Sequence, residues 1–234
     1  MGQSLITVAK DHPSVELVGT IDAGESLESI ALSDAVIDFT HADATLPALK
    51  ECAELGKIIV IGTTGHSNDV RHAIAEASSK IPVIFSPNYS VGVNTLFWLT
   101  KKAAEILGPD YDAEVIEVHH RMKKDAPSGT ARRLVELLDA AYGLDYAKDT
   151  RHGRSGMPGE RTQKEVGVHA VRGGDVVGDH TVMLASPGDR LELIHKASSR
   201  ETFARGALRA ALWARDTKKS QSGLYDMQDV LGLH

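Results

Sequence analysis

The stretch that decides the fold reads E-V-H-H-R-M-K-K-D-A-P-S-G-T-A-R-R, from Glu117 to Arg133. The residues just before it, Ala113 to Val118, alternate polar and apolar side chains, a period typical of a β-strand. Pro127 to Thr130 has the composition of a turn, and leucines recur at helical spacing after it. The stretch is therefore predicted to contain the end of a strand, a loop and the start of a helix.

This loop brings two histidines and two lysines close to the predicted helix start. An imidazole gives or takes a proton near neutral pH, so His119 or His120 is a candidate acid or base. Neighbouring residues of a strand point to opposite faces, so we expect the two histidines to have different roles. Lys123 and Lys124 supply positive charge, and a lysine with cationic neighbours can also donate a proton.

The predicted helix start is a candidate anion site. Its unpaired backbone N–H groups and partial positive charge favour a carboxylate or a phosphate. Gly129 and Thr130 can present an N–H group and a hydroxyl to such an anion. Spacing alone leaves another interpretation open, a solvated basic loop with one buried core histidine, because charged loops are common.

Composition excludes several classes of protein. The chain has 234 residues, 42% of them hydrophobic, which is enough for one large domain or two modest domains. A net charge of -6 gives no reason to expect a nucleic-acid partner. The single cysteine, Cys52, excludes an internal disulfide and fits a reducing compartment. No apolar run approaches the ~20 residues of a membrane span, and no secretion signal is recognisable, so we expect a cytoplasmic protein without a membrane partner.

The first 90 residues alternate predicted strands and helices. The predicted strands are 15–21, 35–40, 58–61 and 82–85, and the predicted helices are 1–10, 45–55 and 68–79. Gly56 is the expected residue just beyond the end of the second helix. This alternation with short links predicts a doubly wound parallel α/β sheet, whose ligands bind beyond the carboxyl ends of the strands.

From Val91 onward the pattern changes. A helix is predicted at 95–107, and the strands 165–171, 175–184 and 190–195 follow one another without crossover helices. They indicate an α+β domain with a mixed sheet. Residues 150–163 are rich in glycine and arginine and are predicted to form a long functional loop, while 202–215 is predicted to be a helix that returns to the first domain. Arg151, Arg154 and Arg161 in the loop are either carboxylate clamps or solvated cations.

The central motif resembles the signature of the dihydrodipicolinate reductase family. That pattern has His-His-Arg, a variable residue, Lys, a variable residue and then Asp-Ala-Pro-Ser-Gly-Thr, and every fixed position matches here. Further motifs that resemble the family follow the same order along nearly the whole chain: V-I-D-F-T at 36–40, I-G-T-T-G at 61–65, N-Y-S-V-G-V-N at 88–94, R-G-G-D-V-V-G-D-H-T at 172–181, H-K-A-S-S-R at 195–200 and G-L-Y-D-M-Q-D-V-L at 223–231.

The resemblance implies an NAD(P)H-dependent reductase of a small cyclic imine dicarboxylate in lysine and diaminopimelate synthesis. It implies that His119 is a proton donor and acceptor and that Lys123 is a second proton donor. His120, Gly129 and Thr130 would bind the substrate. Two substrate carboxylates account for the cations and for the helix start.

The resemblance also implies the domain organisation. Residues 1–90 and 201–234 would form a Rossmann-like dinucleotide-binding domain, and 91–200 a substrate-binding domain that assembles a homotetramer. Cofactor contacts are expected at the strand ends, from Asp22, Gly62, Thr63, Thr64, Ser86, Pro87, Asn88 and Tyr89.

Asp22 and its neighbour bear on the choice of cofactor. An acidic residue at this place hydrogen-bonds the adenosine ribose, although a turn-forming aspartate is an alternative. Ala23, where some family members have an arginine, favours NADH over NADPH.

The family's glycine-rich phosphate loop ends in Arg-Met-Gly, and Met1-Gly2 match its last two residues. We therefore expect the first strand and most of that loop to be absent from the sequence as given, and NADH to bind it weakly or not at all. Two other functions stay open: a truncated, non-catalytic paralogue that keeps the tetramerising second domain but cannot hold the cofactor, and a reductase of another small imine or carbonyl acid. No compact pattern such as H-E-x-x-H occurs among the eleven histidines, so no metal is expected.

Overall fold

The computed structural model describes residues 1–22, 24–218 and 221–233. The chain divides into two compact units. The first unit comprises Met1–Val91 and Arg200–His234, and the second comprises Gly92–Ser199.

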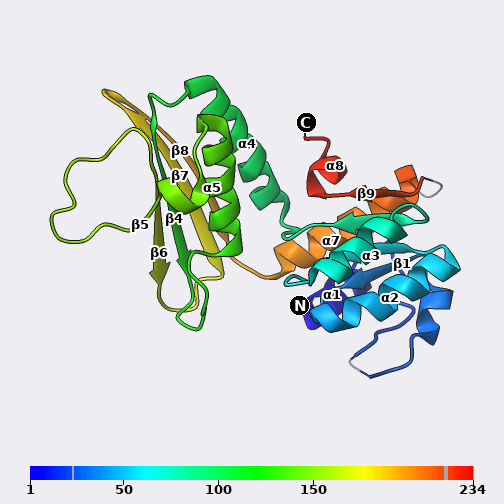
Figure 1. Ribbon diagram of the computed structural model, residues 1–234. Helices are drawn as coiled ribbons and strands as arrows, with labels where there is room; N and C mark the ends of the chain where they lie inside the picture. The colour runs from blue at the N-terminus through cyan, green and yellow to red at the C-terminus, as the bar shows by residue number, and fades with distance from the viewer. Residues whose placement is uncertain (23, 219–220, 234) are drawn as a thin grey trace. The chain divides into compact units, whose positions relative to one another are not determined.

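The first unit contains a parallel sheet of four strands in the order β1-β2-β3-β9 (Figure 1). The strands are β1 (Ala35–Asp38), β2 (Ile58–Ile61), β3 (Pro82–Phe85) and β9 (Gly223–Tyr225). The first three confirm predicted strands. The sequence does not predict β9, because three residues are too few to show a period of two.

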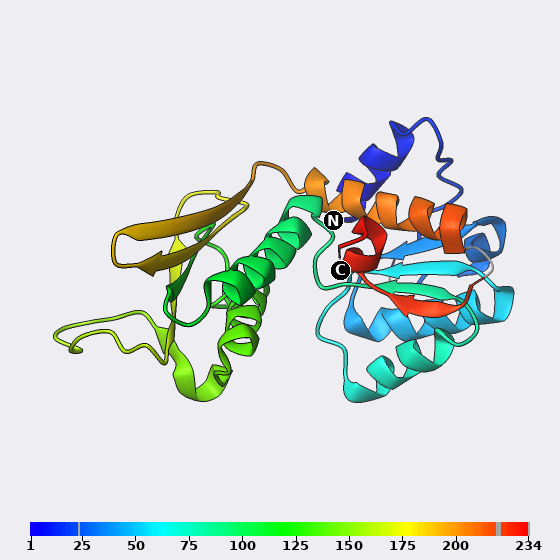
Figure 2. The same cartoon turned by 90° about the horizontal axis from the view of Figure 1, so that it is seen from above.

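Helices cover both faces of this sheet, as a doubly wound fold requires. Ile58 and Val60 of β2 pack in one cluster with alanines of α7 (Glu201–Lys218), while Ile59 and Ile61 pack in another with α2 (Ala42–Leu55) and α3 (Asn68–Ala77). Figure 2 shows α7 on one side of the sheet and α2 and α3 on the other. A continuous apolar strand is the expected pattern for a parallel strand buried on both faces.

Local sequence sets the ends of these helices. Gly56 ends α2 in the left-handed conformation, with φ 65, as predicted. Ser67 begins α3, and its side chain accepts the Val70 N–H. Two further helices belong to this unit: α1 (Gly2–Lys10), which packs on α7 and confirms the predicted helix, and α8 (Met227–Leu231), which follows β9.

The prediction of a strand at 15–21 is wrong. Within the described part of the chain, the backbone groups of residues 16–21 make no hydrogen bond to another segment. A β-strand forms only where a neighbouring strand supplies its hydrogen-bond partners, so a short apolar segment is not sufficient. The apolar side chains still contribute to packing, Val15 beside α1 and α7 and Ile21 in the cluster of α2 and α3. A 3-10 helix at Glu28–Leu32 follows this segment.

The second unit contains a mixed sheet of five strands in the order β5-β6-β4-β7-β8. The central strand β4 pairs parallel with β6 and antiparallel with β7. This confirms the predicted mixed sheet, with strands β4 (Asp112–His119), β5 (Thr150–His152), β6 (Val166–Arg172), β7 (Gly178–Ser186) and β8 (Asp189–Ala197).

Two helices cover one face of the mixed sheet (Figure 1). They are α4 (Val91–Leu107) and α5 (Gly129–Tyr142), and they share a buried cluster with Val115 and Val182 of the sheet. The helix predicted at 95–107 therefore begins one turn earlier. The leucines after the central motif, which predict a helix, lie on the buried side of α5.

Residues 150–163 do not form one continuous loop. The first three form β5, which extends the edge of the sheet beside β6. It follows a short helix, α6 (Tyr146–Asp149), that the sequence does not predict. The remaining loop projects from the sheet in Figure 1. Gly153, Gly156 and Gly159 have positive φ there, a conformation that favours glycine.

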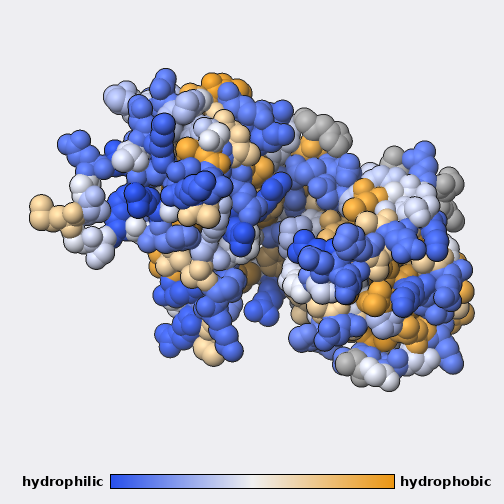
Figure 3. Space-filling model, in the orientation of Figure 1, coloured by the Kyte–Doolittle hydropathy of each residue, from blue (hydrophilic) through white to orange (hydrophobic). Residues whose placement is uncertain are grey.

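The surface of each unit is mixed in character. Figure 3 shows hydrophilic residues over most of the face turned to the viewer, with apolar residues between them. Among the helices of the described ranges, none is long and apolar enough to cross a membrane. Cys52 is buried and free, and burial raises the pKa of its thiol to about 12.

Candidate active site

His119 is the last residue of β4, at the point where the chain leaves the sheet. Its carbonyl oxygen accepts the Gly173 N–H at 2.9 Å, and the Arg121 N–H donates to the Gly174 oxygen at 3.1 Å. These bonds join the loop after β4 to the loop after β6. The predicted strand end is confirmed, and His120 lies just outside the strand.

The imidazole of His119 is held from two sides. It is 8% exposed, and its Nδ1 makes a short hydrogen bond to Oε2 of Glu117, two residues earlier on the same face of β4. The ring of His180, on β7, packs against it edge to face, with ring centroids 5.2 Å apart. The position of this ring is therefore fixed by a carboxylate and by a neighbouring strand.

Glu117 is fully buried and accepts four hydrogen bonds. Besides His119, Arg172 donates from its two terminal nitrogens at 2.8 Å each, and the Ser128 N–H donates at 3.0 Å. Burial alone would raise the pKa of Glu117, but the bonds from His119, Arg172 and Ser128 lower it to about 2. Glu117 is therefore an ionised carboxylate in the interior of the unit.

Ser128 begins α5 and confirms the predicted helix start. Its Oγ accepts the Ala131 N–H at 3.1 Å and lies 3.2 Å from Nε2 of His180. Gly129 and Thr130 are the first two residues of the helix. In the described part of the chain, no atom outside its chain neighbours and its own helix lies within 4 Å of the point where a Cβ on Gly129 would be. The backbone at this helix start therefore faces open space, as an anion site requires.

Lys123 lies in the loop between His119 and the start of α5. Its Nζ is 2.9 Å from Oδ1 of Asp125, which lowers the pKa of that carboxyl group. Its backbone N–H donates to the His120 oxygen at 3.1 Å, which closes a turn. Its side chain is 20% exposed, and its charge also acts on His180. The structure thus brings His119, Lys123 and the helix start into one corner of the second unit.

Sequence reasoning misses three residues of this corner, Glu117, Arg172 and His180. His180 is 4% exposed, and burial, followed by the charge of His119, lowers its pKa to about 3. Its neutral ring can pack against His119 without adding charge. Glu117 and Arg172 are 55 residues apart in the chain, so only the pairing of β4 with β6 brings them together.

A pocket of about 470 Å³ lies at the carboxyl ends of β1 and β2 in the first unit. It includes three of the predicted cofactor contacts, Gly62, Thr63 and Thr64, and its lining residues are Met1, Phe39, Thr40, His41, Ala42, Gly62, Thr63, Thr64 and Gly65. A Cβ on Gly62 would lie 2.2 Å from the ring of Phe39, so any larger residue there would require this ring to move. The pocket is where ligands of doubly wound sheets bind.

A buried carboxylate forms hydrogen bonds to residues on both sides of this pocket. Asp38, at the end of β1, accepts hydrogen bonds from the hydroxyls of Thr40, Thr45 and Thr63. The Thr45 hydroxyl in turn lies 2.9 Å from Nε2 of His66, whose pKa burial lowers. The network joins the loops after β1 and β2. This network could not be predicted from the sequence, because D-F-T indicates only the end of a strand.

The four residues after β3 are tightly placed. Ser86 donates from its hydroxyl to the Asn88 oxygen at 3.0 Å, and Asn88 accepts the Ser90 N–H at 2.8 Å. The Tyr89 hydroxyl is buried and donates to the carbonyl oxygens of Ile61 and Ile84. The Tyr89 side chain therefore belongs to the core. A cofactor could contact this segment, which includes Pro87, only through backbone atoms or exposed side-chain atoms.

Asp22 occupies a turn and does not end a strand. Its N–H donates to Oε2 of Glu25 at 2.7 Å, and the Glu25 N–H donates to its oxygen at 3.1 Å. Its side chain is exposed. Ala23, on which the preference for NADH depends, lies outside the described residues.

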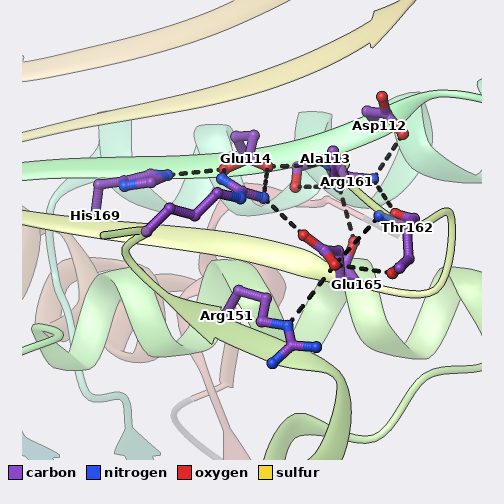
Figure 4. Close-up of polar contacts among 9 residues, drawn as sticks. Asp112, Ala113, Glu114, Arg151, Arg161, Thr162, Glu165 and His169 are labelled. Carbon is purple, nitrogen blue, oxygen red and sulfur yellow. Dashed lines mark hydrogen bonds and ion pairs between the residues drawn. The ribbon is translucent and has the colours of Figure 1, made fainter. Parts of the chain in front are cut away.

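Three arginines, Arg151 of β5 and Arg154 and Arg161 of the projecting loop, are ion-paired with buried carboxylates (Figure 4). Arg154 bonds to Glu114 and Glu165, Arg161 bonds to Glu114, and Arg151 lies 3.7 Å from Glu165. Arg154 and Arg161 are therefore neither free clamps for a substrate carboxylate nor solvated cations. They fasten the loop to β4. No group of three or more possible metal ligands is found in the described ranges.

Comparison with known proteins identifies the family. The model described as "Dihydrodipicolinate reductase, N-terminus" matches residues 1–89, and that described as "Dihydrodipicolinate reductase, C-terminus" matches residues 92–231. This chain belongs to the dihydrodipicolinate reductase family. It is therefore an oxidoreductase with a pyridine-nucleotide-binding domain, as the central motif implies.

Two relatives carry the name 4-hydroxy-tetrahydrodipicolinate reductase. The one from Akkermansia muciniphila is 52% identical over 234 residues, which cover 100% of this chain and 94% of the relative. The one from Hahella chejuensis is 54% identical over 200 residues, which cover 86% of this chain and 74% of the relative.

Solved structures confirm the two-domain fold. The dipicolinate-bound dihydrodipicolinate reductase from Paenisporosarcina sp. TG-14 superposes with a TM-score of 0.77 and 21% identity, covering 97% of this chain and 94% of that chain. The diaminopimelate dehydrogenase of C. glutamicum superposes with a TM-score of 0.52 and 14% identity, covering 96% and 89%.

Proposed function

We propose that this chain reduces 4-hydroxy-tetrahydrodipicolinate to tetrahydrodipicolinate with NADH or NADPH, in lysine and diaminopimelate biosynthesis. The observation that carries the proposal is the buried His119–Glu117 pair next to the uncovered start of α5. Relatives at 52% and 54% identity carry the name of this reductase. The reaction requires a proton donor and a binding site for carboxylates, and this corner provides both.

Each residue of the corner has a proposed role. His119 gives and takes the proton, and Lys123 is the second proton donor. The Gly129 N–H and the Thr130 hydroxyl bind one carboxylate at the helix start, and His120 binds the other. Water leaves the substrate before the ring is reduced, and His119 then protonates the resulting enamine. When bound, a nicotinamide cofactor would supply the hydride.

The pocket of the first unit fits a nicotinamide dinucleotide. Gly62 lets the Phe39 ring pack directly on the backbone that lines the pocket, and the buried Asp38 network keeps the neighbouring backbone in place. Gly62, Thr63 and Thr64 would hold the cofactor there, with Ser86 to Tyr89 at the end of the next strand. NADH is the proposed preference, through an Asp22 contact to the adenosine ribose.

Cofactor and substrate assays test this proposal against its two alternatives. We expect oxidation of NADH or NADPH, followed by absorbance, only when 4-hydroxy-tetrahydrodipicolinate is present. A chain that binds neither cofactor by calorimetry, even with a strand and a G-x-x-G-R segment added ahead of Met1, would be the non-catalytic paralogue. A chain that oxidises cofactor only with other imine or carbonyl acids would be the second alternative, a reductase of another small acid.

The uncovered face of the mixed sheet is the proposed interface of a homotetramer. Two apolar side chains, Val171 and Ile194, are 47% and 53% exposed. Ile194 of β8 lies in register with Thr181 of β7 and Ile116 of β4, so these residues share one face of the sheet. Exposed apolar side chains on a sheet face favour association.

We expect a tetrameric mass by light scattering at micromolar concentration and dissociation in I194D. The control is I106D, which changes an isoleucine that is 81% exposed on α4. A monomeric wild type would refute the interface.

The cytoplasm is the proposed location. The single thiol, Cys52, is buried and unpaired with another cysteine, and a protein of a reducing compartment needs no disulfide.

A further inference from the structure

Glu117 joins the two halves of the proposed site. One carboxylate oxygen bonds to Nδ1 of His119, and the other accepts the N–H of Ser128, the residue that begins α5. Arg172 donates to both oxygens. Because Glu117 is fully buried and both its oxygens are engaged, it acts on the reaction only through the residues that it holds.

We propose that Glu117 is a positioning residue that keeps a proton on Nδ1 of His119, which makes Nε2 the atom that exchanges a proton with the substrate. The same carboxylate ties the imidazole to the helix start, so the proton donor and the carboxylate site keep a fixed distance. This inference rests on the proposed function and deepens it.

The direction of the hydrogen bond follows from the donors around Glu117. An ionised carboxylate can only accept hydrogen bonds, so Nδ1 of His119 must be the donor. Arg172 and the Ser128 N–H both favour the ionised form of Glu117. A neutral His119 then carries its single proton on Nδ1 and leaves Nε2 as a base.

The proton balance uses both nitrogens. The imidazolium form of His119 carries protons on Nδ1 and Nε2. The Nε2–H bond breaks and a C–H bond forms on the enamine carbon, so the ring becomes neutral while the other proton stays on Nδ1, hydrogen-bonded to the Glu117 carboxylate. The carboxylate stabilises the imidazolium before transfer and orients the ring during it.

The space next to Nε2 supports this assignment. A Cβ on Gly178, at the start of β7, would lie 3.0 Å from Nε2 of His119, so glycine leaves this nitrogen uncrowded. Of the titratable and charged groups, Glu117 on its own strand and His180 on β7 contact the ring, Arg172 at the end of β6 bonds to Glu117, and the charge of Lys123 in the loop acts on His180.

The first test is the tautomer of His119, measured by ¹⁵N NMR in the wild-type protein without substrate. We expect the neutral form to carry its proton on Nδ1. A proton on Nε2 would overturn the inference, whatever the enzyme reduces. Failure of the proposed function would appear differently, as a wild type that does not turn over 4-hydroxy-tetrahydrodipicolinate.

The second test compares E117Q and E117D with the control E114Q. Glu114 is also a buried carboxylate of β4 held by arginine and histidine, but it lies on the other face of the strand and does not touch His119. We expect E117Q to lower kcat about 10²-fold and to change the pH profile of kcat, with a smaller effect on KM. E117D should recover part of the rate.

A purely structural role would give a different result. E117Q and E114Q would then both lower the melting temperature and leave the pH profile of kcat at its wild-type position. That outcome would overturn the inference. If E117Q does not fold, the wild-type tautomer and the E117D pH profile decide the question.

Discussion

Arg154 donates from both terminal nitrogens to the carboxylate of Glu114, at 3.0 and 2.7 Å, across 40 residues of chain. Arg161 and His169 donate to the same carboxylate. Burial raises the pKa of Glu114, but these donors lower it to about 2. Because this value is below the ordinary one of 4.5, the stabilisation is complete above pH 4.5 and is lost as the pH falls toward 2.

We therefore predict that R154A destabilises the second unit by about 1–3 kcal/mol at neutral pH, because it leaves two buried carboxylates with fewer donors. This loss of stability should become smaller below pH 4.5, because Glu114 then takes up a proton in the folded and in the unfolded protein. Urea unfolding at fixed protein concentration measures it. R151A is the control, because Arg151 is 62% exposed and 3.7 Å from Glu165. Equal losses in the two variants would contradict the prediction.

Asp139 of α5 has the opposite effect on stability. It is 3% exposed, and within the described ranges neither carboxylate oxygen has a hydrogen-bond partner. Burial, together with Asp149, Asp145 and Glu136, raises its pKa to about 6 from 3.8. The ionised group therefore destabilises the fold fully above pH 6, and this cost disappears as the pH falls through 6 to below 3.8.

We predict that D139N raises the free energy of unfolding by about 1–3 kcal/mol at neutral to mildly alkaline pH. The gain should vanish in acid, where Asp139 is protonated in both the folded and the unfolded state. Denaturant melts across this pH range measure the difference. The exposed Asp110 provides the control, and D110N should change stability by less than about 0.5 kcal/mol. A gain that does not depend on pH would speak against a buried charge.

Lys123 and Lys124 test the assignment of the second proton donor. Lys123 is largely buried and bonded to Asp125, whereas the neighbouring Lys124 is exposed. We predict that K123A lowers kcat by about 10²-fold and that K124A keeps nearly wild-type turnover. Steady-state kinetics at saturating substrate give both values. The assignment fails if the two variants have the same kcat.

Local patterns in the sequence predict much of this fold and part of the site. Alternation before His119 places it at a strand end, and Pro-Ser-Gly-Thr places the start of α5 at Ser128, as the structure confirms. The pairing that brings Arg172 to Glu117 depends on the order of strands in the sheet. That order leaves no periodic signal in either segment, so the residues that hold His119 could not be predicted.

The errors have the same physical origin. Residues 15–21 have the valine, leucine and isoleucine content of a strand, but strand formation also needs a partner strand, which the local sequence does not show. Arg154 and Arg161 lie in a polar, glycine-rich stretch that indicates a solvated loop. They are ion-paired because the sheet order places Glu114 and Glu165 next to that loop.

The most direct test of the account is the kcat of H119A for the reduction of 4-hydroxy-tetrahydrodipicolinate, measured beside the wild type and with melting temperatures for both. The account predicts a fall of about 10²–10⁴-fold, the usual contribution of a general acid, in a protein that melts within a few degrees of the wild type. A folded H119A that turns over at the wild-type rate would contradict it.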